Sequence, residues 1–205
     1  MNFKIKFTLL GETSVGKTSL FYRYIYNKFP ENFQSTIGVD SQIKGIEFKG
    51  YKINAHIFDT TGQEKFHSIT KLYLKNTHGF FLVFDLTNRN SLKGLNNWIE
   101  EIKLVNNNDI DNNNIIILGN KKDLNDLIVV KDEEIKELGK NTGFKIIQTS
   151  AKTGEGIKEA LDAMLELIFG SKSQEEIYNE FIPHYKYKKL INKNEKKNHK
   201  DVHCC

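Results

Sequence analysis

Cysteine is almost missing from this sequence: the only two cysteines are its last two residues, Cys204 and Cys205. The rest of the chain cannot form an internal disulfide, which excludes a disulfide-stapled fold and is typical of a reducing compartment. Long apolar runs are missing too. The best, GFFLVFDL at 79–86, is far shorter than the ~18 residues of a membrane helix and is broken by Asp85. The N-terminal MNFKIKFTLL is too short for a secretory signal, so we expect a chain made and kept in the cytosol.

The chain also lacks a strong charge over most of its length. Its formal net charge is +4, but residues 184–205 hold seven lysines and two acidic residues, which leaves residues 1–183 at about −1. A near-neutral body argues against a nucleic-acid-binding face, so we expect no nucleic-acid partner. The lysine-rich tail indicates a contact of its own, or a merely solvated segment.

Strand-like and helix-like segments alternate from residue 3 to residue 170. Apolar strands are predicted at 3–10, 79–86, 114–120 and 145–150, and two further strands, 39–48 and 51–58, meet at a predicted hairpin turn, Lys49-Gly50. Helical spacing follows in 18–29, 91–105, 130–141 and 155–170. This alternation predicts an α/β fold: a three-layer domain over residues 1–170, with a mostly parallel sheet and helices on both faces. Residues 171–205 are predicted to be a flexible, lysine-rich tail.

The segment GETSVGKTS, at 11–19, lies between a predicted strand and a predicted helix. Gly11 and Gly16 permit a tight turn whose backbone N–H groups face an anion, Lys17 can reach the β- and γ-phosphates, and the Thr18 hydroxyl can bind Mg²⁺. The alternative is an ordinary strand-to-helix turn. The predicted nucleotide contacts in this loop are Gly11, Glu12, Thr13, Ser14, Val15, Gly16, Lys17, Thr18 and Ser19.

Two further segments indicate guanine as the base. NKKD, at 120–123, follows a buried strand, and the Asp123 carboxylate can accept hydrogen bonds from both N1–H and the 2-amino group of guanine, a pair that adenine lacks. SAK, at 150–152, follows another strand, where its backbone N–H groups can contact the guanine carbonyl. Alone, NKKD also fits a charged turn. The predicted base contacts are Asn120, Lys121, Asp123, Ser150, Ala151 and Lys152.

DTTGQEKF, at 59–66, follows a strand and supplies groups that suit the γ-phosphate. Asp59 can hold Mg²⁺ through water, the Gly62 N–H can approach the phosphate, and Gln63 can orient the attacking water. Thr36, in QSTIG, offers a second hydroxyl to Mg²⁺ if its loop folds over the nucleotide. Two loops that order around γ-phosphate and Mg²⁺ make a switch. The predicted catalytic residues are Lys17, Thr36 and Gln63, and the predicted magnesium ligands are Thr18, Thr36 and Asp59.

With these segments in this order, residues 3–170 and the C-terminal end closely resemble the Rab family of the Ras superfamily of small GTPases. The resemblance rests on GETSVGKT, STIGVD, DTTGQEKF, HGFFLVFDLTNRNSL, GNKKDL, TSAK and the terminal Cys-Cys. It implies stacking of guanine on Phe29, a phosphate-side contact near Phe33, and GTP, GDP and Mg²⁺ as ligands. It also implies a monomer that hydrolyses GTP to GDP, acts in vesicle trafficking, and depends on an exchange factor, a GTPase-activating protein, effectors, prenylation machinery and a GDP-dissociation inhibitor.

Arginine is scarce, and this bears on the hydrolysis rate. The two arginines, Arg23 and Arg89, both lie outside the loop before Thr36, so no arginine finger in cis is visible. A partner's arginine accelerates a related small GTPase ~10⁵-fold, so unaided turnover should be slow. Thr61 also replaces the alanine usual in the family and can obstruct the attacking water. The alternative function is therefore a slow- or non-hydrolysing, GTP-bound membrane scaffold; an ATPase is a remoter one.

The effector-facing aromatic positions also depart from the family pattern. Ser41 stands where phenylalanine is usual and Phe58 where tryptophan is usual, and only Tyr73 matches. The family's effector choice therefore does not carry over to this chain.

Cys204 and Cys205 admit three interpretations: inert thiols, a metal site with His199 and His203, or lipid attachment points. The Rab resemblance implies geranylgeranylation of both. Two lipids, or one lipid plus a basic patch, anchor a protein stably, and lysines near an anionic leaflet add ~1 kcal/mol each. We expect a lipid-anchored protein at the cytoplasmic face of an endomembrane or the plasma membrane, with a soluble cytosolic pool.

Overall fold

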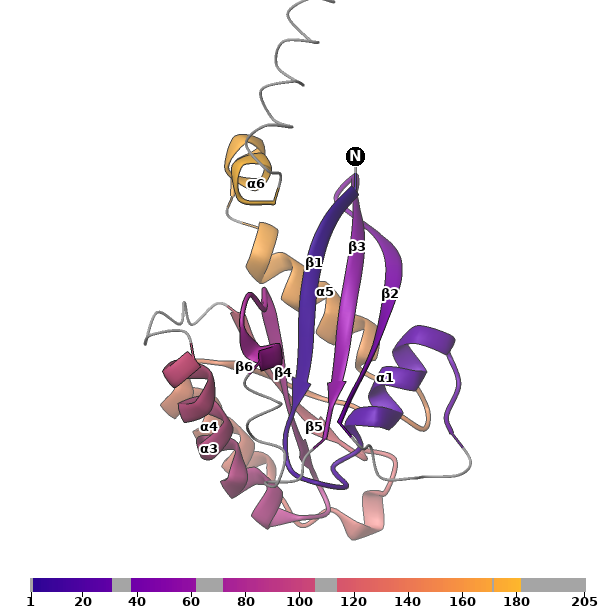
Figure 1. Cartoon of the computed structure of the whole chain (residues 1–205). Helices are drawn as coiled ribbons and strands as arrows, with labels where there is room; N and C mark the ends of the chain where they lie inside the picture. Colours follow the sequence, from indigo (N-terminus) through magenta and orange to yellow (C-terminus); the bar gives the residue numbers. More distant parts are fainter. Residues whose placement is uncertain (1, 31–37, 62–71, 106–113, 171, 182–205) are drawn as a thin grey trace, which may run out of the picture.

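A six-stranded sheet in the order β2-β3-β1-β4-β5-β6 forms the centre of the molecule (Figure 1). The computed structural model describes residues 2–30, 38–61, 72–105, 114–170 and 172–181. The strands are β1 (Asn2–Leu10), β2 (Val39–Phe48), β3 (Tyr51–Thr60), β4 (Gly79–Asp85), β5 (Ile115–Asn120) and β6 (Lys145–Gln148).

The sheet is parallel except for β2, which pairs antiparallel with β3. The two strands meet at Lys49 and Gly50, whose φ values of 48° and 81° are both positive. A two-residue turn with two positive φ angles matches the twist of a hairpin, which is why glycine suits its second position. The predicted hairpin and the mostly parallel sheet are confirmed.

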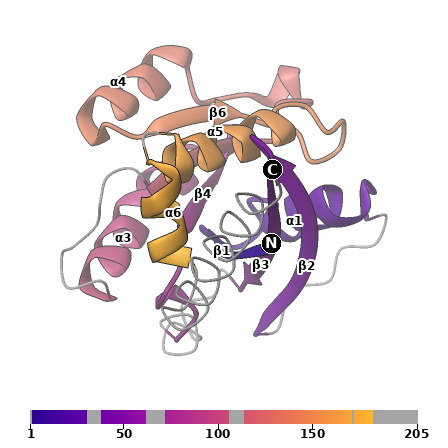
Figure 2. The ribbon, with the colours of Figure 1, turned by 90° about the horizontal axis from the view of Figure 1, so that it is seen from above.

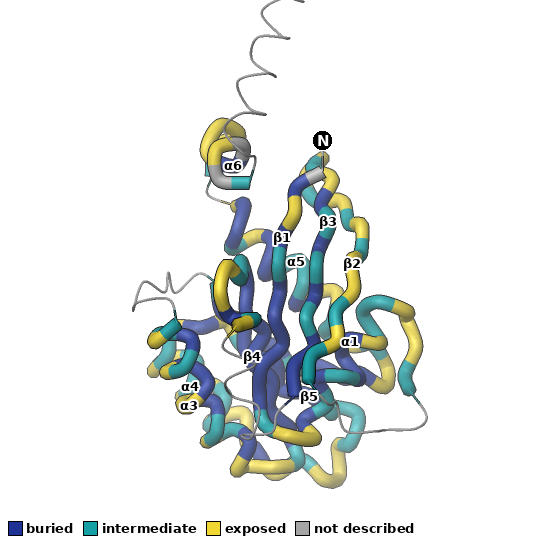
Figure 3. Tube along the Cα trace, viewed as in Figure 1, coloured by how far each residue is buried: buried dark blue, intermediate teal, exposed yellow. Residues whose placement is uncertain are grey.

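Helices cover both faces of the sheet and bury two separate cores. α1 (Lys17–Tyr26) and α5 (Ile157–Phe169) pack on one face, and α3 (Arg89–Val105) and α4 (Asp132–Thr142) pack on the other (Figure 2). β4 serves both layers, because Phe81 and Val83 belong to the first core while Leu82 and Phe84 belong to the second. A strand buried on both faces is typical of a parallel sheet, and Figure 3 shows β4 as continuously buried. The predicted three-layer α/β fold is confirmed.

The sequence predicts a flexible tail over residues 171–205, but the described part of that range, residues 172–181, contains a helix. This helix, α6 (Gln174–Phe181), begins with a reciprocal cap. The Ser173 N–H donates to the Glu176 carboxylate at 2.6 Å, and the Glu176 N–H donates to Ser173 Oγ at 3.3 Å. Two such bonds satisfy orphan N–H groups of the first turn and stabilise even a short helix.

α6 packs onto the end of the sheet where β1 begins. Ile177 is only 2% exposed, and the Phe181 ring lies 5.3 Å from the Phe169 ring and 6.2 Å from the Phe3 ring. The sequence pattern missed this helix because Ile177, Tyr178 and Phe181, the three apolar or aromatic residues of a polar segment, are too few to show a helical stripe. Residues 182–205 lie outside the described residues.

The parallel strands end together at the opposite end of the sheet from α6 and the N-terminus (Figure 1). Ligands of open α/β sheets bind outside the carboxyl ends of the strands, so this edge is where a site is expected. None of the helices in the described ranges is long and apolar enough to cross a membrane.

Candidate functional site

The loop from Gly11 to Gly16 connects the end of β1 to the start of α1 and lies tightly against the neighbouring strands. Gly11 has φ 143°, and a Cβ there would lie 2.2 Å from the Val83 carbonyl oxygen of β4. Gly16 has φ 97°, and a Cβ there would lie 2.4 Å from Asn120 Nδ2. Side chains at either position would collide with the sheet, so the two glycines let the backbone form a shallow cradle at the helix N-terminus.

Lys17, the first residue of α1, folds back across this cradle. Its side chain is almost fully enclosed, at 5% exposed, and Nζ donates to the carbonyl oxygens of Gly11 at 2.8 Å and Glu12 at 2.7 Å. Burial lowers the pKa of the Lys17 ammonium to about 8, although the nearby Asp59 and Glu12 carboxylates act in the opposite direction. A buried ammonium that donates to neutral carbonyl oxygens is strongly stabilised when an anion binds beside it.

Thr18 and Asp59, two of the three predicted magnesium ligands, are brought together. Thr18 Oγ1 donates to Asp59 Oδ2 at 2.7 Å, across the gap between the start of α1 and the end of β3, and Asp59 is fully buried. Hydroxyl and carboxylate oxygens are the hard donors that Mg²⁺ prefers, so this pair fits that ion. The third predicted ligand, Thr36, lies outside the described residues.

Asn120, at the end of β5, joins the glycine loop at residues 11–16 to the loop at residues 150–152. Its Nδ2 donates to the Val15 carbonyl oxygen at 2.9 Å, and its Oδ1 accepts from the Ala151 N–H at 3.2 Å. Asn120 is buried, so both bonds lie away from solvent and are strong. The side chain therefore sets the distance between residues 11–16 and residues 150–152.

The predicted base-binding side chains lie on two adjacent loops. Ser150 Oγ donates to Asp123 Oδ1 at 2.6 Å, and the Lys122 N–H donates to the Thr149 carbonyl oxygen at 3.0 Å. The first of these bonds fixes one oxygen of the Asp123 carboxylate in position. The structure thus brings together the segments 120–123 and 150–152, which are far apart in sequence. Phe29, downstream of α1, is half-buried against the first core.

Asp85, at the end of β4, is a site residue that the sequence prediction missed. Its Oδ2 pairs with Lys121 Nζ at 2.7 Å, and its Oδ1 accepts from the Thr87 N–H at 2.8 Å and Thr87 Oγ1 at 2.7 Å. Lys121 has a positive φ of 67°, a backbone conformation that costs energy in a non-glycine residue. The ion pair with Asp85 helps to hold Lys121 in that conformation. The signal was present, because Asp85 is a carboxylate that directly follows an apolar strand.

Thr61, the position that departs from the family pattern beside the proposed γ-phosphate, lies just beyond β3. It is buried, at 3% exposed, and its N–H donates to the Gly38 carbonyl oxygen at 3.1 Å. The predicted contacts that lie outside the described residues are Phe33, Thr36, Gly62, Gln63, Cys204 and Cys205.

The positions expected to face effectors form one aromatic cluster on β2, β3 and the segment before β4. The Phe58 ring lies 5.5 Å from the Tyr73 ring and 4.2 Å from the His56 ring, and Lys6 Nζ lies 4.9 Å from its centroid. Ser41 Oγ contacts His56 Nε2 at 3.2 Å. Burial, and next the Lys6 charge, hold the pKa of His56 below its ordinary value. Ser41 thus brings a hydroxyl to a position that is aromatic in the family pattern, and that hydroxyl contacts His56.

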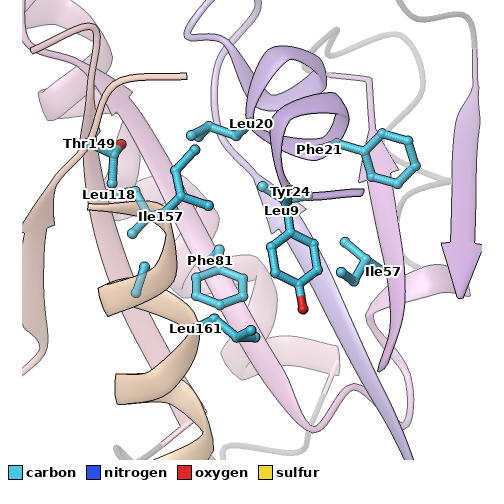
Figure 4. Close-up of a pocket in the computed structure, with 11 residues that line it drawn as sticks. Leu9, Leu20, Phe21, Tyr24, Ile57, Phe81, Leu118, Thr149, Ile157 and Leu161 are labelled. Atoms are coloured by element: carbon cyan, nitrogen blue, oxygen red, sulfur yellow. The ribbon is translucent and has the colours of Figure 1, made fainter. Parts of the chain in front are cut away.

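An apolar cavity of about 40 Å³ lies between α1, α5 and the sheet, and it is separate from the candidate site (Figure 4). None of its lining residues is a predicted nucleotide contact. Within the described ranges, the Tyr24 hydroxyl in its wall is buried without a hydrogen-bond partner, and burial raises the pKa of Tyr24. The cavity is part of the core and does not contribute to the edge where the loops meet.

Comparison with known proteins agrees with this geometry. A model of the Ras family matches residues 6–170. The rat Ras-related protein Rab-27A is 37% identical over 177 residues, covering 82% of this chain and 79% of the relative. The human Ras-related protein Rab-27B is 34% identical over 183 residues, covering 84% of this chain and 83% of the relative. The chain therefore belongs to the Rab family of small GTPases, within the Ras superfamily.

Proposed function

We propose that this protein is a switch that binds GTP and GDP with Mg²⁺, hydrolyses GTP to GDP, and recruits effectors at a membrane in vesicle trafficking. Members of the Ras family bind these nucleotides, and the activity of this chain is inferred from that membership. The observation that carries the proposal is the meeting of three loops at one sheet edge: the glycine cradle with Lys17, the Thr18–Asp59 pair, and the Asp123–Ser150 pair.

The phosphates would lie in the cradle of residues 11–16. There the backbone N–H groups and the α1 dipole face negative charge, and Lys17 exchanges its two carbonyl contacts for phosphate oxygens. Thr18, Asp59 and Thr36 would hold Mg²⁺, which neutralises charge on the phosphate oxygens. Gln63 would orient the attacking water. Because phosphoryl transfer needs positioning and charge stabilisation more than covalent chemistry, these groups suffice for a slow intrinsic rate.

The base would lie between segments 120–123 and 150–152. Asp123 would accept the two guanine N–H groups, and Ser150 holds one of its oxygens in place. Lys121, fixed by Asp85, would lie along the base. ATP would leave the Asp123 acceptors unmatched, at a cost of ~1–3 kcal/mol for each buried group.

Nucleotide affinity should depend on pH through Lys17. The pKa of Lys17 is about 8 without a ligand, and a bound phosphate raises it because it favours the charged ammonium. The affinity for the nucleotide is therefore highest well below about pH 8, where Lys17 is already charged, and it falls as the pH rises above that value. We expect the GDP association constant to fall several-fold between about pH 7.5 and about pH 9, measured by titration calorimetry. Lys17→Arg is the control, because its guanidinium stays charged and any affinity it retains should not change over this range. A flat wild-type profile would contradict a phosphate contact by Lys17.

Membrane attachment should depend on the terminal cysteines. The double variant Cys204→Ser, Cys205→Ser should move a fluorescently tagged full chain from membranes to the cytosol, because the lysine-rich tail alone binds weakly and reversibly. The double variant His199→Ala, His203→Ala is the matched control: it keeps both thiols, so it should remain on membranes. If the histidine variant is lost from membranes and the cysteine variant is retained, lipid attachment is the wrong role.

The partners proposed for this switch follow from family membership: an exchange factor, a GTPase-activating protein, effectors, prenylation machinery and a GDP-dissociation inhibitor. Effectors would bind the cluster of Phe58, Tyr73, His56 and Ser41. Because His56 and Ser41 add polar groups to this cluster, its effectors should differ from those that bind an all-aromatic surface.

A second candidate is a GTP-loaded membrane scaffold that hydrolyses slowly. The observation that favours it is the burial of Thr61, two residues beyond Asp59, with its backbone bonded to Gly38. Thr61, a side chain larger than alanine, is thus buried just beyond the end of β3, at the sheet edge proposed to hold the phosphates.

A further inference from the structure

Arg23, in α1, places its guanidinium on the backbone of two separate segments. Nε donates to the Ala151 carbonyl oxygen at 2.8 Å, and Nη2 donates to the Lys152 carbonyl oxygen. Nη1 donates to the Asn27 carbonyl oxygen at 3.0 Å. The side chain also packs beside Gly154, where an added Cβ would lie 3.7 Å from Arg23 Cδ. One planar group thus satisfies three carbonyls at once, which is the geometry that distinguishes arginine from lysine.

The two segments lie on either side of the proposed base site. Ala151 and Lys152 belong to the segment proposed to contact the guanine carbonyl. Asn27 ends α1 in the left-handed conformation, with φ 53°, and the chain runs directly from it to Phe29. Arg23 therefore holds the base-contacting loop against the turn that sets the position of Phe29.

Arg23 also closes a circuit of hydrogen bonds around this site. Asn120 accepts from the Ala151 N–H and donates to the Val15 carbonyl oxygen, in the loop that leads into α1. α1 carries Arg23, which returns to the carbonyl oxygen of the same Ala151. Ala151 is thus held on both sides, at its N–H by Asn120 and at its carbonyl oxygen by Arg23, so loss of Arg23 removes one of these two supports of the loop at 150–152.

We propose that Arg23 is a positioning residue that sets how fast guanine nucleotide leaves the site, because it locks the loop at 150–152 to the end of α1. The inference rests on the proposed function. Opening of the base side requires the 150–152 loop to move away from Phe29, and the Arg23 bonds must break for that movement. Arg23 thus controls the lifetime of the bound state without touching the nucleotide.

The test compares Arg23→Lys and Arg23→Gln with the wild type in dissociation of a fluorescent GDP analogue, chased with excess GDP. Both variants lose at least one of the paired carbonyl contacts, so we expect dissociation roughly tenfold faster in each. Arg89→Lys is the matched control. Arg89, the chain's other arginine, binds the Val129 carbonyl oxygen at 2.7 Å and Glu134 at 3.0 Å, away from both segments. Its rate should stay within about twofold of the wild type.

Hydrogen exchange separates positioning from general stability. In Arg23→Lys with GDP bound, the amides of residues 150–154 and 24–29 should exchange faster, while those of β4 and β5 stay unchanged. Unchanged dissociation in a GDP-binding variant, or exchange that rises equally throughout the sheet, overturns the role of Arg23. If the wild-type protein binds no guanine nucleotide, the proposed function fails first, and this inference fails with it.

Discussion

The Asp123→Asn variant is expected to bind GDP about a hundredfold more weakly than the wild type. The Asp123 carboxylate would accept two hydrogen bonds from guanine, and bonds to a charged group contribute about 1.5–3 kcal/mol each. An asparagine amide offers one acceptor and turns an N–H₂ group toward the second guanine donor. The fold should survive, because an amide oxygen can still accept the Ser150 Oγ bond that holds this side chain at 2.6 Å.

The measurement is GDP affinity by titration calorimetry, with thermal unfolding as the check on folding. Asp126→Asn is the matched control, because Asp126 is an exposed carboxylate in the short helix η3 (Asn125–Leu127), just beyond Asp123. It changes the charge of the same loop without changing the proposed contact, so its affinity should match the wild type. Equal GDP affinity of the two variants would refute base recognition by Asp123.

The Thr61→Ala variant is expected to hydrolyse GTP at least tenfold faster than the wild type in single turnover. Thr61 is buried two residues beyond Asp59, and its backbone N–H is bonded to the Gly38 carbonyl oxygen. In the proposed GTP complex it would stand beside the γ-phosphate, where the attacking water must be placed. A displacement of about 1 Å in such a geometry costs about a hundredfold in rate.

Single-turnover hydrolysis of γ-labelled GTP, with Mg²⁺ and with or without a Rab GTPase-activating protein, makes the comparison. Thr61→Ser is the informative second variant, since it removes the methyl group and keeps the hydroxyl. A fast serine variant identifies the methyl group as the obstruction, and a slow one identifies the hydroxyl. If wild type and Thr61→Ala are equally fast with the activating protein, the scaffold function is excluded and the switch remains.

Local patterns were enough to predict most of the sheet. The apolar runs of β4 and β5 indicated strands buried on both faces, and Lys49-Gly50 indicated the hairpin between β2 and β3. Gly11, Gly16 and Lys17 were predicted as an anion-binding loop, and the structure places them between strand and helix with no room for a side chain at either glycine. These features depend on residues within one turn or one strand, so the sequence determines them by itself.

Only the tertiary structure showed which groups share a site. Arg23 and Ala151 are 128 positions apart, and the Asp85–Lys121 pair forms because β4 and β5 are neighbours in the sheet. α6 likewise depends on distant aromatic partners, Phe3 and Phe169, which its own eight residues do not reveal. Periodicity records which face of one element is buried, but not what covers it. The sequence alone therefore determined the six strands, the helices α1, α3, α4 and α5, the family resemblance and the loop chemistry, while packing decided α6 and the contacts that hold those loops in position.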